Sequence, residues 1–314
     1  MRHVLVTGAG GYIGRALSRA LVPLLRDGRT QTLTLVDLDL PDTDGGAPGL
    51  RRIRGDLGDL HVLQAATEPA PTTVFHLAGI TSRLAEEQFA LGLRVNLLST
   101  VSLFERLREQ AQQPVLVYAS SIGVFGTPLP ERIDDATPPA PTLSYGAQKR
   151  MVEVLLADYA RRGWIDGRAL RLPSVVARPA QAQAALSSFA SDLIRELAEG
   201  RPYTCPVSAD ARLWWLSLPA CVDQLRHAAA LPADALPPQR AWTLPALRAS
   251  VGEVVQALRK RFAAEVDARL RFAPQAALQA QFAQWPVLTT ETARRLGHQH
   301  DGDLDTLIER ALSP

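Results

Sequence analysis

Cysteine is scarce in this sequence, which has only Cys205 and Cys221 among 314 residues. Two thiols cannot form the disulfide framework of a small secreted domain, and they suit a reducing compartment. Long apolar runs are also missing, since no uninterrupted stretch approaches the roughly 20 residues that a membrane-spanning helix needs. The first residues lead directly into the strand-like segment Val4-Leu5-Val6, so no signal peptide is expected. These absences predict a cytoplasmic protein without a membrane partner.

A strong excess of either charge is absent as well. The formal net charge is +2, and the arginines are dispersed along the chain. Nucleic-acid binding rests on clustered cations that neutralise phosphates, so no nucleic-acid partner is expected. With 46% hydrophobic and 21% charged residues, the composition is that of an ordinary globular protein. The length allows one large domain or two closely joined domains.

Short apolar segments alternate with helical patterns through the first half of the chain. We expect strands at residues 4–7, 32–37, 52–57, 73–79 and 114–121. Such alternation predicts an α/β fold, a Rossmann-type doubly wound parallel sheet with helices on both faces. Ligands of such sheets bind beyond the carboxyl ends of the strands.

The strict alternation ends after Pro179. Helical runs at 184–199, 219–230 and 251–262 then mix with short strands at 241–244 and 270–272. We therefore expect a Rossmann domain at 1–172, to which part of 210–245 returns, and a smaller mixed C-terminal lobe at 173–314 that mainly binds substrate. Trp214 and Trp215 are expected to pack in the core or an interface.

The first strand runs into a glycine-rich turn, and a helical pattern follows. The spacing is Gly8-x-x-Gly11-x-x-Gly14. In this context the glycines let the backbone approach a pyrophosphate, and the helix N-terminus attracts the anion. Asp37 ends the second strand, where an acid can accept hydrogen bonds from a ribose and repels a 2′-phosphate. The unit predicts NAD rather than NADP.

Tyr145 and Lys149 stand four residues apart at the start of an amphipathic helical pattern. This spacing places both side chains on one face of a helix. A phenol ionises near pH 10, and a neighbouring ammonium lowers that pKa toward the working range. The pair can therefore move a proton on or off an alcohol. Because the spacing is common in helices, its meaning depends on the surrounding motifs.

These motifs occur together, in the order typical of a known family. The set comprises Gly8-x-x-Gly11-x-x-Gly14, Asp37, Gly55-Asp56-Leu57, His76-Leu77-Ala78, Asn96, Ser120-Ser121-Ile122-Gly123-Val124-Phe125-Gly126 and Tyr145-x-x-x-Lys149. To about residue 180, the chain resembles the extended short-chain dehydrogenase/reductases of the NAD-dependent epimerase/dehydratase superfamily. The resemblance implies an NAD-dependent enzyme acting on CH–OH groups, and a homodimer formed through four helices.

The resemblance also implies roles for individual residues. Tyr145 would be the acid/base, Lys149 would lower its pKa and bind the nicotinamide ribose, and Ser121 would hydrogen-bond the reacting oxygen. The residues implied at the cofactor are Gly8, Gly11, Tyr12, Ile13, Gly14, Asp37, Asp56, Leu57, Leu77, Ala78, Gly79, Asn96, Tyr145, Lys149 and Pro173. Ser120 should face away from Ser121 on a strand, so a structural role is expected for it and for His76.

Several segments narrow the reaction. Ile122-Gly123 directly follow Ser121, where dehydratases of the family often carry Asp-Glu, and Ser174 stands where sugar-nucleotide enzymes usually have an Asn. The segments 129–135, 166–173, 187–191, 205–208, 212–217 and 231–236 resemble the D-erythronate dehydrogenases. That group oxidises the C2 hydroxyl of a four-carbon sugar acid to a 2-oxo acid. Residues 180–183 (Ala-Gln-Ala-Gln) depart from its Gly-Lys-Pro-Asn-like loop, so the identity of the acid stays open.

A sugar acid needs cationic or multiple donors around its carboxylate, and arginine suits that geometry. Arg178 and Arg212 are the main candidates, followed by Arg83, and the sequence leaves the choice open. Ser82 is expected to contact the substrate together with Ser121 and Tyr145.

Two other functions stay open. One is an epimerase that retains its NAD and acts on a sugar or sugar nucleotide. The other is a non-catalytic dinucleotide sensor, against which the intact Ser121, Tyr145 and Lys149 argue. His298-Gln299-His300-Asp301 contain possible metal ligands, but we expect a solvated loop and no metal site because no further ligand cluster accompanies them.

Overall fold

A computed structural model of the chain describes residues 1–40, 46–179, 188–262, 265–282 and 284–313. The chain divides into two compact units. The first unit comprises Met1–Val124, Leu143–Arg171 and Leu225–Trp242, and the second comprises Phe125–Thr142, Leu172–Gln224 and Thr243–Pro314. Over the described ranges, no helix is both long enough and apolar enough to cross a membrane.

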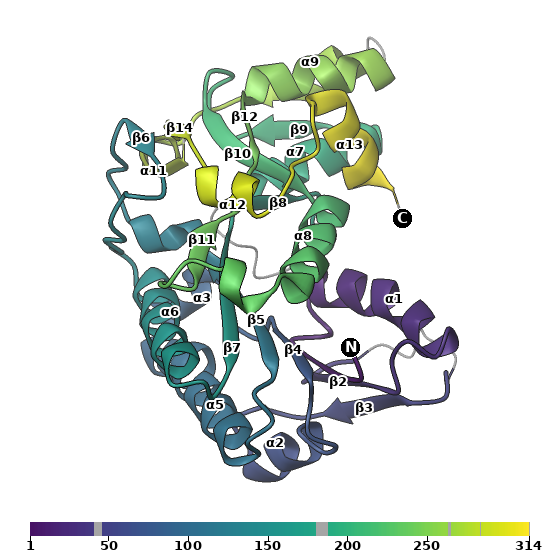
Figure 1. The fold of residues 1–314 in the computed structure, drawn as a ribbon. Helices are drawn as coiled ribbons and strands as arrows, with labels where there is room; N and C mark the ends of the chain where they lie inside the picture. Colours follow the sequence, from purple (N-terminus) through teal and green to yellow (C-terminus); the bar gives the residue numbers. More distant parts are fainter. Residues whose placement is uncertain (41–45, 180–187, 263–264, 283, 314) are drawn as a thin grey trace. The chain divides into compact units, whose positions relative to one another are not determined.

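The first unit is built on a seven-stranded sheet with the order β11-β7-β5-β4-β1-β2-β3 (Figure 1). Its strands are β1 (His3–Thr7), β2 (Thr32–Asp37), β3 (Leu50–Arg54), β4 (Thr73–His76), β5 (Val115–Ser121), β7 (Asp166–Leu172) and β11 (Ala241–Thr243). Pairing is parallel from β3 through β2, β1 and β4 to β5. The strand order reverses between β1 and β4, so the predicted doubly wound α/β fold is confirmed.

Helices connect the strands of this sheet. They are α1 (Tyr12–Arg26), α2 (Leu60–Ala66), α3 (Ser82–Glu87), α4 (Phe89–Gly92), η1 (Leu93–Leu98), α5 (Ser99–Glu109), η2 (Ile122–Phe125), α6 (Ser144–Arg161), α8 (Leu218–Ala230) and η3 (Ala233–Ala235). α1 packs on β1 and β2, and α6 packs on β5. The two helices lie on opposite sides of the sheet (Figure 1).

The helical stretch before β5 contains one irregularity. α4 and α5 are joined by η1, a π-helical segment that carries Asn96. The apolar spacing predicts a regular helix there, because it does not register one wider turn. Such π-helical turns often occur at functional sites.

Apolar side chains fill the layer that holds α5 and α6 against the sheet. Leu5 and Leu116 from the strands belong to one buried cluster with Phe104 of α5 and Val152 and Leu156 of α6. Burying a large apolar side chain stabilises a fold by about 2 kcal/mol. This layer therefore fixes the strand ends and the helix on which the candidate site stands.

The second unit contains three small sheets, with the orders β12-β10-β8, β13-β9 and β14-β6. Its strands and helices are β6 (Arg132–Ile133), β8 (Ser174–Val176), α7 (Phe189–Ala198), β9 (Tyr203–Cys205), β10 (Arg212–Ser217), β12 (Leu247–Ser250), α9 (Val251–Phe262), α10 (Glu265–Arg269), β13 (Leu270–Phe272), α11 (Ala276–Phe282), β14 (Val287–Leu288), α12 (Glu291–Arg295) and α13 (Leu304–Leu312). Trp214 and Trp215 are buried, and their indole N–H groups donate to the carbonyls of Pro286 and Ala249. Their predicted role in core packing is confirmed.

The prediction of a solvated loop at 298–301 is wrong. His298 and Asp301 are only 3% and 5% exposed. The carboxylate of Asp301 accepts hydrogen bonds from the backbone N–H and the hydroxyl of Ser217, immediately before α8, so it faces protein rather than water. Among the residues that the structure describes, no group of three or more His, Cys, Asp or Glu side chains is arranged to hold a metal ion.

Candidate active site

The turn between β1 and α1 exposes backbone where a dinucleotide would bind. Gly8 has a φ of +70°, which favours glycine. A Cβ on Gly14 would lie 2.0 Å from the carbonyl oxygen of Gly8, so no larger residue fits there. Gly11 precedes α1 without a side-chain cap, which leaves the first N–H groups of the helix to an anion. The residues present therefore fit the pyrophosphate of NAD.

Two carboxylates follow the neighbouring strands. Asp37 ends β2 and accepts a hydrogen bond from the Gly10 N–H at 2.9 Å, so it faces the glycine turn. Asp56 follows β3, accepts from the Gly58 N–H at 2.9 Å and is ion-paired with Arg94. The Gly58 hydrogen bond, followed by Arg94, holds the pKa of Asp56 below its ordinary value. Both carboxylates lie at the carboxyl ends of their strands, where the cofactor is expected to bind.

Ser121 and Tyr145 lie against the same glycine. A Cβ on Gly123 would be 3.4 Å from Ser121 Oγ and 3.6 Å from Tyr145 Cδ1. Ser121 ends β5, and its Oγ accepts the Gly123 N–H at 3.1 Å. The Lys149 ammonium lies 5.6 Å from the centroid of the Tyr145 ring. The three candidate catalytic side chains are therefore together at the carboxyl end of β5, with Ser121 and Tyr145 only half-buried.

Lys149 is buried behind this pair. Its Nζ donates to the carbonyl oxygen of Ala119 at 2.8 Å and lies 4.7 Å from the centroid of the Tyr118 ring. Burial lowers the pKa of Lys149 to about 8, and the carboxylate of Glu153 opposes that shift. An ammonium in this position favours the phenolate form of a neighbouring tyrosine.

Asn96 fastens the loop after β4 to α6. Its Oδ1 accepts the Ile80 N–H at 2.8 Å, and its amide nitrogen donates to Gln148 at 2.7 Å. Gly79 lies inside this arrangement, since a Cβ there would be 3.0 Å from Asn96 Oδ1 and 3.5 Å from Lys149 Nζ. A Cβ on Gly8 would similarly lie 2.6 Å from the Ala78 nitrogen. Residues 77–79 therefore run beside both the glycine turn and Lys149.

His76 lies beneath the site and is 1% exposed. Its Nδ1 is 2.6 Å from Thr7 Oγ1, and its Nε2 is 2.8 Å from Thr100 Oγ1. Burial, followed by the charge of Lys149, lowers the pKa of His76 to about 3. The imidazole is neutral at pH 7 and joins two hydroxyl groups, which suits the structural role predicted for it.

The three candidate arginines differ in their partners. Arg83 is ion-paired with Glu87 at 2.8 Å, and Arg212 with Glu253 at 3.0 Å. Arg178 forms no ion pair with any residue that the structure describes, and its Nε donates only to a backbone carbonyl, at 3.3 Å. A carboxylate ligand would not have to displace a protein acid from Arg178.

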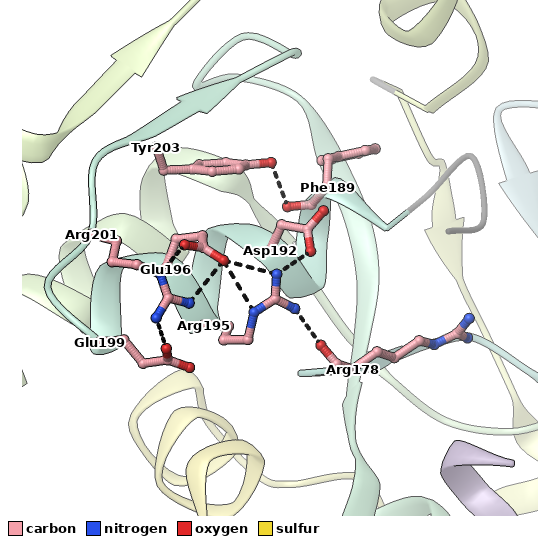
Figure 2. Close-up of polar contacts among 8 residues, drawn as sticks. All are labelled: Arg178, Phe189, Asp192, Arg195, Glu196, Glu199, Arg201 and Tyr203. Carbon is pink, nitrogen blue, oxygen red and sulfur yellow. Dashed lines mark hydrogen bonds and ion pairs between the residues drawn. The ribbon is translucent and has the colours of Figure 1, made fainter. Parts of the chain in front are cut away.

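Arg195 of α7 holds the main chain that carries Arg178. Its Nη1 donates to the Arg178 carbonyl at 2.6 Å, and its Nη2 contacts Asp192 and Glu196 at 2.7 and 2.9 Å. Arg201 binds the same Glu196 from the other side. Figure 2 shows the Arg178 side chain extending away from this cluster. The cluster thus fixes the backbone of Arg178 and leaves its guanidinium clear of these acids.

The remaining predicted residues fall at chain turns. Tyr12 and Ile13 begin α1, Leu57 precedes α2, and Ser82 is the first residue of α3. Pro173 directly follows β7 and belongs to the second unit. The divergent segment at 180–183 lies outside the described residues.

Sequence reasoning missed four side chains of these networks: Arg94, Gln148, Glu153 and Arg195. A signal existed for Glu153, which follows Lys149 by four residues just as Lys149 follows Tyr145. An acid on that buried stripe of α6 needs a partner inside the protein. The others make contacts between distant segments or with backbone, which residue spacing does not reveal.

Comparisons with known proteins agree with this geometry. Residues 4–237 match the NAD dependent epimerase/dehydratase family. The chain is 39% identical to D-erythronate dehydrogenase of Cupriavidus necator, over 98% of this chain and 96% of the relative. It is 31% identical to D-erythronate dehydrogenase of Haemophilus influenzae, over 98% of each chain. The crystal structure of the nucleoside-diphosphate-sugar epimerase from Agrobacterium tumefaciens is 35% identical, with a TM-score of 0.92 over 98% of this chain and 92% of that chain.

The family match spans the whole Rossmann sheet apart from its last strand, and the relatives extend the similarity through the second unit. The glycine turn, Asp37 and the strand order meet the requirements of a bound NAD. The chain therefore belongs to the NAD dependent epimerase/dehydratase family, the extended short-chain dehydrogenase/reductases, and is an NAD-dependent oxidoreductase.

Proposed function

We propose that the protein oxidises the C2 hydroxyl of a small sugar acid, such as D-erythronate, to the 2-oxo acid with NAD. The observation that carries the proposal is the grouping of Ser121, Tyr145 and Lys149 at the end of β5. This arrangement can bind a hydroxyl oxygen and remove its proton. The similarity to two D-erythronate dehydrogenases supports the choice of a sugar acid.

In the proposed mechanism, the residues of α6 and β5 act on one oxygen atom. The phenolate of Tyr145 takes the proton from the substrate hydroxyl, while Ser121 Oγ hydrogen-bonds the same oxygen and holds it in place. The Lys149 ammonium favours the phenolate. NAD, when bound, supplies the oxidant for the substrate carbon.

Residues 1–172, with part of 210–245, are proposed to hold NAD, and residues 173–314 mainly to bind the substrate. The glycine turn would bind the pyrophosphate, Asp37 the adenosine ribose, and Lys149 the nicotinamide ribose. The proposed cofactor residues are Gly8, Gly11, Tyr12, Ile13, Gly14, Asp37, Asp56, Leu57, Leu77, Ala78, Gly79, Asn96, Tyr145, Lys149 and Pro173. Ser82 is proposed to contact the substrate.

Arg178 is the proposed ligand of the substrate carboxylate. A guanidinium can bind a carboxylate through two parallel hydrogen bonds. The ion pairs of Arg83 and Arg212 make those two arginines less suited, because each would have to exchange its protein acid for the substrate. The anchored backbone of Arg178 supports the assignment, since it restricts where the guanidinium can reach.

A second candidate is an epimerase that retains its NAD and acts on a sugar or sugar nucleotide. The similarity to the nucleoside-diphosphate-sugar epimerase structure favours it. Ser174, where the sugar-nucleotide enzymes usually carry Asn, argues against a nucleotide substrate.

NADH absorbance separates the two candidates. The protein mixed with NAD and a panel of four- to six-carbon aldonic acids should release NADH in proportion to the acid consumed, with D-erythronate or a close relative. Epimerised sugar or sugar nucleotide without net NADH would support the second candidate and contradict the first. Mass and chirality of the product identify the reacting carbon.

Tyr145→Phe tests the assigned base. Removing the phenol oxygen should lower kcat by about 100- to 10,000-fold, the usual contribution of acid–base catalysis. NAD affinity, measured by quenching of tryptophan fluorescence, should stay within about twofold, because the ring is retained. Activity near the wild-type level would overturn the mechanism.

We also propose a homodimer formed through α6 and η1. These elements pack against each other, and both carry large exposed apolar side chains: Met151 and Val154 on α6, and Leu98 on η1. A second copy would bury this surface, since grouped apolar side chains commonly mark an interface.

Cytoplasmic localisation and the absence of nucleic-acid and membrane partners stay predictions, which cell fractionation can test.

A further inference from the structure

A buried carboxylate lies one turn beyond Lys149 on α6. The Glu153 side chain is 0% exposed. Its Oε1 accepts from Ser120 Oγ at 2.6 Å, and its two oxygens accept from Nε and Nη2 of Arg171, each at 2.9 Å. Arg150 contributes a further donor at 3.0 Å. A two-point guanidinium–carboxylate contact of this kind fixes geometry as well as charge.

Glu153 joins the elements that form the candidate site. On α6 it continues the row of Tyr145 and Lys149, because successive spacings of four keep side chains on one helix face. Ser120 belongs to β5, and Arg171 to the neighbouring strand β7. The Glu153 carboxylate therefore joins α6 to the two strands β5 and β7 next to the candidate site.

The attachment of β5 to α6 ends immediately before Ser121. The carbonyl of Ala119 accepts from Lys149, and the hydroxyl of Ser120 donates to Glu153. The next residue, Ser121, reaches toward the Tyr145 ring beside Gly123. These two attachments hold the residues immediately before Ser121 and so restrict where Ser121 lies. A shift of about 1 Å between reacting groups is enough to slow a reaction.

Glu153 also supplies the negative charge near Lys149. Tyr145 faces Lys149 from α6, Tyr118 from β5 and His76 from β4. Burial keeps His76 neutral by lowering its pKa, and keeps Tyr118 neutral by raising its pKa. Glu153 raises the pKa of Lys149 against the effect of burial.

We propose that Glu153 is a positioning residue for the reaction, which holds the strand end that presents Ser121 and supplies the counter-charge of Lys149. The inference rests on the proposed function, in which Ser121 and Lys149 serve Tyr145. It adds a carboxylate that does not touch the substrate but acts on two residues that do.

Glu153→Gln tests the electrostatic part without turnover. NAD affinity should weaken with rising pH as Lys149 loses its proton, and tryptophan fluorescence can follow this binding. In Glu153→Gln the pH at which NAD affinity weakens should be lower by about one pH unit. This value is the lower end of the effect that a nearby opposite charge has on a pKa. Glu153→Asp, which keeps the charge, should retain the wild-type pH. An unchanged pH in Glu153→Gln would refute the electrostatic role.

A second variant covers the case in which unpaired Arg171 prevents folding. The double substitution Glu153→Gln/Arg171→Met removes both charges, and a smaller fall in this pH is expected, because loss of the Arg171 cation partly offsets loss of the carboxylate. An unchanged pH in the folded double variant would refute the role equally.

Ser120→Ala tests the positioning part and leaves the Glu153–Arg171 pair in place. We expect kcat to fall about tenfold, as for a small displacement of reacting groups, with NAD affinity and its pH dependence unchanged. The matched control is Ser18→Ala, at a buried serine whose hydroxyl has no hydrogen-bond partner among the described residues, and it should retain the wild-type kcat. Wild-type kcat in Ser120→Ala overturns the positioning role. A wild-type protein that makes no NADH contradicts the proposed function alone, because the binding measurements need no reaction.

Discussion

At the scale of single residues, burial acts on two nitrogen bases of the first unit with different results. His76 is held neutral between two threonine hydroxyls. Lys149 is equally buried, but its ammonium donates to Ala119 and has Glu153 as a nearby counter-charge. Desolvation therefore keeps His76 neutral, whereas Lys149 has a pKa close to the working range.

His76 should make the protein acid-sensitive. Its pKa is lowered from 6.5 to about 3 in the folded state, so the unfolded chain binds a proton that the folded chain does not between those values. Stability is therefore lost as pH falls, by roughly 2–3 kcal/mol between pH 7 and 4.5. Urea unfolding of wild type and His76→Gln at the two pH values measures this difference. Parallel losses in both proteins would show that His76 does not contribute.

Arg178→Met should raise KM for the acid by about 10- to 100-fold, because a two-point carboxylate contact is lost. NAD affinity should not change. Arg212→Met is the matched control, since Arg212 already has an acid partner, and its KM should change by less than about threefold. Steady-state kinetics with both variants decides the assignment, and a larger effect at Arg212 would reverse it.

At the scale of elements, apolar periodicity predicts the regular helices well. α9 occupies the predicted residues 251–262, and α8 begins one residue before its predicted start at 219, because each buries one apolar face. The spacing could not predict the π-helical turn of η1 or the hydrogen bonds of Asn96, because both arise from segments brought together by folding. In the candidate site, helix spacing indicated Tyr145 and Lys149, and the family resemblance indicated Ser121. Glu153 contacts Ser120 and Arg171, and Arg195 contacts the Arg178 carbonyl, across different segments, so residue spacing could not predict these contacts.

Arg195→Met tests whether α7 positions Arg178. The variant removes the hydrogen bond to the Arg178 carbonyl, so the guanidinium should reach more conformations and KM for the acid should rise about threefold to tenfold. Arg201→Met serves as the comparison, because Arg201 binds the same Glu196 but not Arg178. If both variants have the wild-type KM for the acid, the cluster around Arg195 does not contribute to substrate binding.

At the scale of the whole molecule, the exposed apolar side chains of α6 and η1 support the homodimer that the family resemblance implies, which residue periodicity alone did not specify. Periodicity shows that a helix has an apolar face, but not that apolar residues also lie on its outer side. Met151 and Val154 are exposed on the helix whose opposite face carries the buried Lys149 and Val152. Assembly of two copies through this surface would therefore brace the helix that holds the candidate base.

Val154→Glu combined with Met151→Glu should convert the dimer into monomers, because two charges would have to be desolvated at the interface. Light scattering after size-exclusion chromatography measures the mass. Leu60→Glu, at an exposed leucine on α2, is the control and should keep the wild-type mass. A wild-type protein that is monomeric at all concentrations would contradict the proposed assembly.

The buried ammonium on α6 also has a chemical consequence. Lys149 and Lys260 are the only lysines among 34 Lys and Arg residues, and Lys260 lies on the surface beside Asp305. Arginine keeps its proton, whereas an amine with a pKa of about 8 is partly a free nucleophile under mildly alkaline conditions. An acylating or aldehyde reagent small enough to enter would therefore modify Lys149 Nζ within the site, in addition to the exposed amines of Met1 and Lys260. Bound NAD would block access of the reagent to Lys149, so the extent of Lys149 modification would report whether the cofactor is present.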